Sequence, residues 1–123
     1  MMSGMHSELE RLEPDDARLP EAARTLAAAM AGTPWIRWAL AEEPRDLERL
    51  YAFYVALAVR CGEVWITPAA DAVACWTHSE RDADAAALFS DPAAPHPTER
   101  EQRAAALLAE HAHEGPHWRL AAV

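Results

Sequence analysis

The spacing of hydrophobic positions predicts that the chain begins with a strand followed by a helix. Leucines and charged residues alternate over residues 9–13, which predicts a half-buried strand that ends at Pro14. Apolar residues then recur every three or four positions over residues 17–31, which predicts a helix with Asp16 as its N-cap. The buried face of this helix is expected to contain Leu19, Ala23, Leu26 and Met30.

A second helical pattern is followed by two β-rich runs. Helical spacing extends over residues 45–61, and Gly62 is expected to stop this helix at its C-terminus. The apolar stripe of the helix is expected to comprise Leu47, Leu50, Tyr51, Tyr54, Leu57, Ala58 and Cys61. Residues 63–67 and 72–77 are rich in strand-forming side chains, and the turn-forming residues 68–71 between them predict an antiparallel hairpin.

The last third of the chain predicts two helices and a terminal strand. A short helix is expected over residues 82–89, and Thr98 is expected to cap a later helix that Gly115-Pro116 stops. The later turns of that helix are marked by Leu107, Leu108 and His111. Residues 117–123 form an apolar run that predicts a strand with an open edge, and such edges favour pairing with other chains.

Length and charge indicate a single domain and exclude several kinds of partner. The 123 residues suit one domain, 1–123, in which residues 1–6 are expected to be disordered. Twenty acidic and 11 basic residues give a formal charge of -9 without an arginine cluster, which argues against nucleic-acid binding. No apolar run is long enough to cross a membrane, and the acidic N-terminal stretch does not fit a signal peptide. We therefore expect a cytoplasmic protein that does not bind membranes.

Neither a metal site nor a disulfide is predicted. His111 and His113 would point about 200° apart on a helix, and His117 lies beyond the Gly-Pro break, so these imidazoles do not converge on one ion. Cys61 and Cys75 lie among apolar neighbours, which favours free thiols in the core. No side chain is therefore assigned as a metal ligand.

The five tryptophans are the most informative side chains for function. Trp65 and Trp118 lie in predicted strands, where packing between strands accounts for them. Trp35 and Trp38 follow a helix end, on a segment that other residues are expected to cover, and Trp76 lies near the end of a strand. Aromatic rings in such places can form the wall of a substrate pocket.

Four stretches of the chain, taken in order, resemble a known enzyme family. They are AARTLAAAM at residues 22–30, GEVWI at 62–66, AVACWT at 72–77 and WRLAAV at 118–123. In this order they resemble the N-terminal half of the GCN5-related N-acetyltransferase (GNAT) family, in its puromycin-acetylating branch. The resemblance implies an α+β chain with a partial GNAT fold. That fold is a mostly antiparallel sheet of strands 1–4 with flanking helices, and it ends at strand four.

The resemblance also implies a cofactor and a substrate class. Members of the family transfer the acetyl group of acetyl-CoA to a small-molecule amine, which in this branch is an aminonucleoside antibiotic. Their fourth strand is followed by the motif Gln/Arg-x-x-Gly-x-Gly/Ala, whose backbone binds the pyrophosphate of coenzyme A. The 123 residues contain no such motif, and their four glycines are scattered. The chain is therefore expected to be truncated before the pyrophosphate loop and inactive by itself.

Site residues follow from the resemblance only where positions match. The backbone of Ala121, Ala122 and Val123 matches the part of strand four that approaches the acetyl and pantetheine groups. The region that shapes the acceptor-amine pocket matches Trp35, Trp38, Tyr54 and Trp76. Glu63 and Glu80 lie near the elements that supply a catalytic base, but both fit ordinary surface carboxylates equally well, so no catalytic residue is assigned.

Two other functions remain open from the sequence. The chain could be a non-catalytic interaction module whose C-terminal strand pairs with a second copy or with a separately encoded second half. It could also be a small ligand-binding α+β domain that uses a tryptophan-lined cleft. The order of the strands tests the last of these functions, because a GNAT origin requires strands one to four to be consecutive antiparallel neighbours. A strictly monomeric protein would argue against the interaction module.

Overall fold

A computed structural model of the chain describes residues 9–112 and 114–122, which form an α+β fold. The strands are β1 (Glu10–Arg11), β2 (Gly62–Ile66), β3 (Val73–His78) and β4 (Trp118–Ala122). The helices are α2 (Leu19–Met30), α3 (Pro34–Ala39), α4 (Leu47–Cys61), α5 (Asp82–Phe89) and α6 (Glu99–Ala109), with a short 3-10 turn at Ser79–Arg81. None of the described helices is long and apolar enough to span a membrane.

The four strands form one sheet in the order β1-β2-β3-β4, and each neighbouring pair is antiparallel. The predicted hairpin is confirmed, with Val64 opposite Cys75. The predicted first strand is confirmed but shorter than residues 9–13. Leu12 is buried while Leu9 is 54% exposed, because positions three apart on a strand face opposite sides of the sheet.

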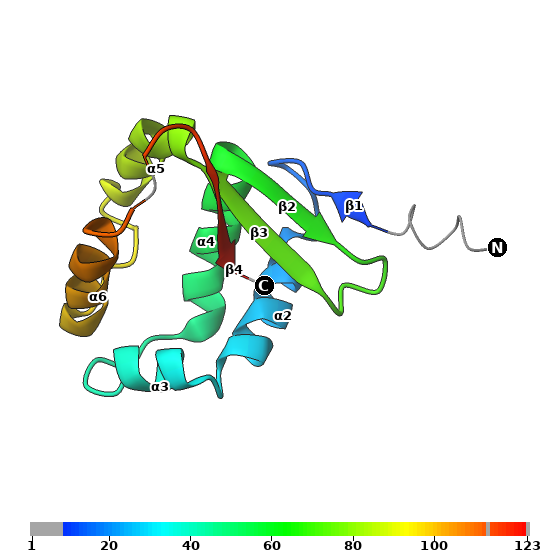
Figure 1. The fold of residues 1–123 in the computed structure, drawn as a ribbon. Coiled ribbons are helices and arrows are strands. Elements are labelled where there is room, and N and C mark those ends of the chain that lie inside the picture. The colour runs from blue at the N-terminus through cyan, green and yellow to red at the C-terminus, as the bar shows by residue number, and fades with distance from the viewer. Residues whose placement is uncertain (1–8, 113, 123) are drawn as a thin grey trace.

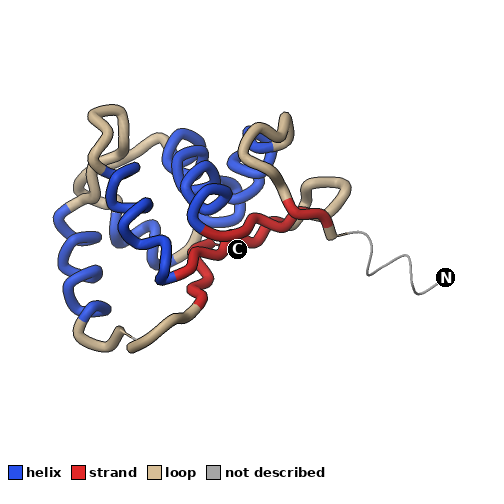
Figure 2. The backbone as a smooth tube through the Cα atoms, turned by 90° about the horizontal axis from the view of Figure 1, so that it is seen from above, coloured by secondary structure: helices blue, strands red, loops and turns tan. Residues whose placement is uncertain are grey.

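Helices α2 and α4 pack against one face of β2 and β3, and no described helix covers the opposite face of these strands (Figure 1, Figure 2). The predicted apolar face of α2 is confirmed in this core, and that of α4 is confirmed in part. Side chains from the helices and from the covered face of the sheet meet there, including Ala22, Ala23, Leu26, Tyr51, Val55, Ala58, Val64, Ile66, Val73 and Cys75. Leu50, Leu57 and Cys61 of the predicted α4 stripe are buried but lie outside this cluster. Helix α6 lies beyond α4, on the side away from β1 (Figure 1).

The prediction that Asp16 caps the first helix is wrong. Helix α2 begins at Leu19, and its N-cap position is Arg18, whose side chain makes no capping bond. Asp16 lies too early to reach the helix amides. Its carboxylate instead accepts hydrogen bonds from the backbone and guanidinium of Arg18, and these bonds lower the pKa of Asp16.

Gly62 follows α4 as predicted, but for a different reason. A glycine that stops a helix adopts a left-handed conformation, whereas the φ of Gly62 is -173°, which is extended backbone. Helix α4 therefore runs directly into β2. A Cβ atom at this position would collide with the carbonyl of Trp76 in β3, so it is the close approach of the two strands that requires a glycine.

The capped helix after Thr98 is confirmed, but it ends at Ala109, so the predicted stop at Gly115-Pro116 and the place of His111 in its later turns are wrong. The helix is attached to the fold at its N-terminal end. The Thr98 hydroxyl accepts from the Glu101 amide, and the Glu101 carboxylate accepts from the Thr98 amide, so the two residues form a capping box. The same hydroxyl donates to the buried carbonyl of Ala39 at 2.8 Å. Leu107 and Leu108 are 60% and 69% exposed, so only the N-terminal end of α6 is anchored in the fold.

Candidate functional site

A cleft of about 270 Å³ lies between α4, α5 and the adjoining ends of β3 and β4. Its apolar lining comes from Tyr54, Leu57, Ala85 and Phe89. Its polar lining comes from Cys61, Thr77, His78, Arg81, Asp82 and Arg119. The cleft therefore combines an aromatic and aliphatic wall with a few converging polar groups, which is the usual composition of a small-molecule site.

Thr77 and Arg119 bring two polar side chains of the sheet together at this cleft. They are directly opposite each other in β3 and β4, so their side chains share the face that looks toward α4. Thr77 is only 9% exposed as a residue, and its side chain lines the cleft. A hydroxyl on the wall of a cleft can form a hydrogen bond with a ligand that enters it.

An ion pair lies on the rim of the cleft. Both terminal nitrogens of Arg119 donate to the carboxylate of Asp82, the first residue of α5. The two side chains are 44% and 55% exposed. This pair ties β4 to α5 and places one positive and one negative group beside the apolar wall.

Two tyrosines of α4 have their rings 6.0 Å apart; Tyr54 lines the cleft, and Tyr51 lies in the buried core. Burial raises the pKa of Tyr51 to about 12, and the neighbouring Tyr54 and Glu101 add to the effect. Burial and Glu101 also raise the pKa of Tyr54. Both hydroxyls therefore keep their protons at neutral pH, and the hydroxyl of Tyr54, which lines the cleft, can donate a hydrogen bond to a ligand.

The raised pKa of Tyr51 predicts a loss of stability in alkaline solution. The folded state favours the neutral phenol, so its stabilising contribution is complete below the unfolded-state pKa of about 10 and disappears as the pH rises to about 12. We expect the free energy of urea unfolding to fall across this interval, and to fall less steeply in a Tyr51→Phe variant. Equal slopes for the two proteins would contradict the assignment.

The pairing of β4 with β3 contains a bulge. Cys75 is opposite Ala122, and Trp76 is opposite Leu120, so Ala121 has no opposing residue in β3. A bulge interrupts the ladder and leaves the extra residue unpaired. Ala121 and Ala122, two of the predicted cofactor-contact residues, therefore lie at an irregular point of the backbone, and Val123 lies outside the described residues.

The structure does not bring the four predicted substrate-binding residues together. Tyr54 lines the cleft. Trp35 and Trp38 lie on helix α3 rather than in a loop, 5.7 Å apart between ring centroids, and remain 44% and 42% exposed. The expected cover is therefore partial, and it includes Arg100, whose guanidinium lies 5.4 Å from the centroid of the Trp38 ring. Trp76 precedes Thr77 in β3 and so faces the opposite side of the sheet.

The two carboxylates considered as bases lie outside the cleft. Glu63 and Glu80 both line a shallow hollow of about 310 Å³ beside His78 and Trp118. The Glu63 carboxylate accepts a hydrogen bond from the indole of Trp65 and pairs with Arg11 at 3.5 Å. These contacts favour a structural role for Glu63, and a catalytic base stays unassigned.

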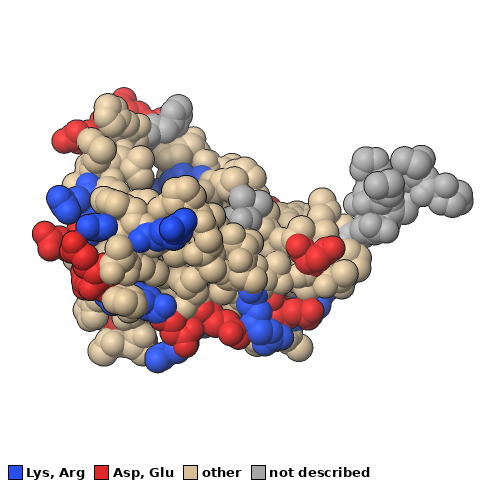
Figure 3. Space-filling model, turned by 90° about the horizontal axis from the view of Figure 1, so that it is seen from below, with Lys and Arg blue, Asp and Glu red and all other residues tan. Residues whose placement is uncertain are grey.

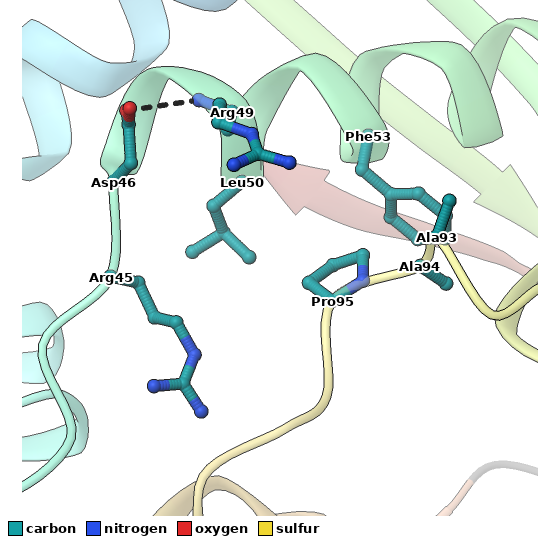
Figure 4. Close-up of a pocket in the computed structure, with 8 residues that line it drawn as sticks. All are labelled: Arg45, Asp46, Arg49, Leu50, Phe53, Ala93, Ala94 and Pro95. Atoms are coloured by element: carbon teal, nitrogen blue, oxygen red, sulfur yellow. Dashed lines mark hydrogen bonds between the residues drawn. The ribbon is translucent and has the colours of Figure 1, made fainter.

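Another hollow, of about 260 Å³, lies at the start of α4 (Figure 4). Two arginines contribute its positive charge, Arg45 and Arg49. The guanidinium of Arg45 already donates to the carbonyls of Glu43, Pro44 and His96. This hollow lacks the combination of an aromatic wall with both charges that the cleft beside β4 has.

On the face of the molecule shown in Figure 3, charged side chains lie mainly along the border, and the middle is mostly uncharged.

Both cysteines are buried free thiols, as predicted. Burial raises the pKa of Cys75 to about 12 and also raises the pKa of Cys61, so neither thiol is activated as a nucleophile. The described residues contain no cluster of three side chains suited to a metal ion. Of the histidines considered as ligands, His113 lies outside the described part of the chain.

Sequence reasoning missed most of the cleft. Thr77, Asp82 and Arg119 come from three elements, and their meeting depends on the register between β3 and β4. The only available signal was the order of strand, acidic helix start and strand. No family model and no solved structure matches this chain. Its chemistry is therefore inferred from the cleft and the bulged strand themselves.

Proposed function

We propose that this protein has an N-acetyltransferase-like function, with acetyl-CoA as donor and a small-molecule amine as acceptor. The observation that carries the proposal is the bulge at Ala121, on the strand that matches the donor-binding strand of the GNAT family. The consecutive antiparallel order β1-β2-β3-β4 is the order that the resemblance requires. The cleft between β4 and α4 supplies an adjacent place for an acceptor.

The chain's own groups fit the donor in part. The backbone of Ala121 and Ala122 would hold the acetyl and pantetheine portion, because an edge strand offers N–H and C=O groups to an extended ligand. When bound, acetyl-CoA supplies an activated thioester. In the transfer, a base would take the ammonium proton, the free amine nitrogen would form a bond to the acetyl carbon, and the C–S bond would break. Coenzyme A would leave as a thiolate that takes up a proton. An amide at the bulge would donate to the carbonyl oxygen as negative charge builds on it.

Backbone NMR of the isotope-labelled chain tests the proposal. We expect acetyl-CoA to shift the amide signals of β4 while those of α2 stay in place. The affinity should be weak, weaker than about 1 μM, because the 123 residues contain no glycine-rich motif for the pyrophosphate. Ala121→Pro removes the amide proton at the bulge and should abolish the shifts, whereas Ala121→Gly should retain them.

The outcomes separate the two parts of the proposal. If millimolar acetyl-CoA moves no signal of β4, the acetyltransferase-like function is wrong. Micromolar binding with turnover of an amine would instead contradict the expectation that the chain is impaired by itself.

The open edge of β4 supports a second candidate function, self-association. Within the described part of the chain no strand pairs with the outer edge of β4, and Trp118 and Leu120 beside it are 50% and 49% exposed. Two copies could join edge to edge through these backbone groups. Light scattering over a range of concentrations should then show dimers that Leu120→Lys weakens, and a strictly monomeric protein would exclude this function.

A further inference from the structure

The rim and the interior of the cleft differ sharply in chemistry. The rim carries the adjacent carboxylate of Asp82 and guanidinium of Arg119, both about half exposed. The apolar wall is formed by the rings of Tyr54 and Phe89, 6.3 Å apart between centroids, and by Leu57 and Ala85. Leu57 is its buried part, whereas Phe89 is 42% exposed. A matching ligand therefore has an apolar body and a head group that carries both charges.

The wall between the rim and the interior holds a further polar side chain. Thr77 is 9% exposed as a residue and lines the cleft. Its side chain lies beside that of Arg119, because the two residues are opposite each other in the sheet. A hydroxyl next to a guanidinium can share the recognition of one carboxylate.

We infer that the cleft binds a zwitterionic α-amino acid with an apolar side chain. The carboxylate of the ligand accepts hydrogen bonds from Arg119 and Thr77. Its ammonium donates to the carboxylate of Asp82, and its side chain packs on Tyr54 and Phe89. The cleft volume of about 270 Å³ suits a ligand of this size. The inference rests on the proposed function only in treating this amine as the acetyl acceptor.

Binding requires the Asp82–Arg119 pair to open. Exposed ion pairs contribute little to stability, so separating this one is not a large obstacle. A zwitterion inserted between the two groups gives each of them a new partner of opposite charge. A ligand with only one charge would leave either Asp82 or Arg119 without a partner, and it should therefore bind more weakly.

NMR titration with three ligands of the same skeleton tests the inference. L-Phenylalanine carries both charges, phenethylamine lacks the carboxylate, and 3-phenylpropionate lacks the ammonium. We expect phenylalanine to bind about ten-fold more tightly than either of the others, the ratio that one charge-assisted hydrogen bond provides. Signals of β3, β4 and α5 should move. Equal binding of the three ligands, or no binding of phenylalanine below about 10 mM, would overturn the inference.

Variants assign the two ends of the ligand. Arg119→Gln should remove the advantage of phenylalanine over phenethylamine, and Asp82→Asn should remove its advantage over 3-phenylpropionate. Arg11→Gln is the matched control, because it breaks the exposed pair with Glu63 outside the cleft and should change no ratio. An unchanged ratio in both cleft variants would contradict the assignment, and the comparison of ligands on the unaltered protein does not depend on how the variants fold.

The two proposals fail in different ways. Loss of phenylalanine binding while acetyl-CoA still shifts the amides of β4 would reject the amino-acid site alone. Phenylalanine binding without any response to acetyl-CoA would reject the acetyltransferase-like function and leave the amino-acid site standing.

Discussion

Replacing Gly62 by alanine is expected to cost about 3 kcal/mol or more of folding free energy, because overpacking a close backbone contact forces the neighbouring strand to move. The new Cβ atom would meet the carbonyl of Trp76 and the Cα of Thr77, which are backbone atoms and cannot swing aside. The strain falls on the β2–β3 pairing, which also positions Thr77 in the cleft. Urea unfolding followed by far-ultraviolet circular dichroism measures the loss.

Gly32 provides the matched control for this substitution. A Cβ atom at Gly32 would meet nothing within 4 Å. Gly32→Ala should therefore change the unfolding free energy by less than about 1 kcal/mol, and the reduced freedom of the unfolded chain favours a small gain. Equal effects of the two substitutions would show that the approach of β3 to Gly62 is not the reason for this glycine.

Replacing Thr98 by alanine should cost about 2–4 kcal/mol in total, from the lost helix cap and from a buried carbonyl left without its donor. The Thr98 hydroxyl accepts from the Glu101 amide at 3.1 Å and donates to Ala39 at 2.8 Å. Both bonds disappear together.

Thr98→Ser separates the hydroxyl from the methyl group. It retains both hydrogen bonds and should cost only about 1 kcal/mol for the buried methyl. Urea unfolding gives both free energies. A serine variant as unstable as the alanine variant would mean that packing, rather than the hydroxyl, attaches α6 to the fold.

Local sequence patterns predicted two kinds of element. The first kind is stabilised by residues close in the sequence, and the second buries apolar residues at regular helical spacing. The stripes of α2 and α4 were readable because each face packs on one side of the sheet. The short helix over residues 82–89 was predicted with the bounds it has in the structure. The Thr98 cap was equally visible, because a capping box needs only residues three apart.

Features that depend on distant partners were not readable. Asp16 has a side chain suited to capping a helix, but its carboxylate accepts a hydrogen bond from the backbone amide of Arg18 instead. Leu107 and Leu108 have helical spacing, yet the fold brings no covering surface to them. The meeting of Thr77 with Arg119 depends on pairing between strands some forty residues apart in the chain, which no local pattern encodes.

The location of the tryptophans has an optical consequence. All five indoles lie at the surface or are only partly buried, and none belongs to the apolar core. Trp35, Trp38 and Trp118 are exposed, so much of the fluorescence of the folded protein should come from indoles in contact with water. Denaturation should therefore shift the emission maximum less than it does in proteins with core tryptophans. If a second copy paired with β4, it would remove part of the Trp118 indole from water, and the emission maximum would move to shorter wavelengths.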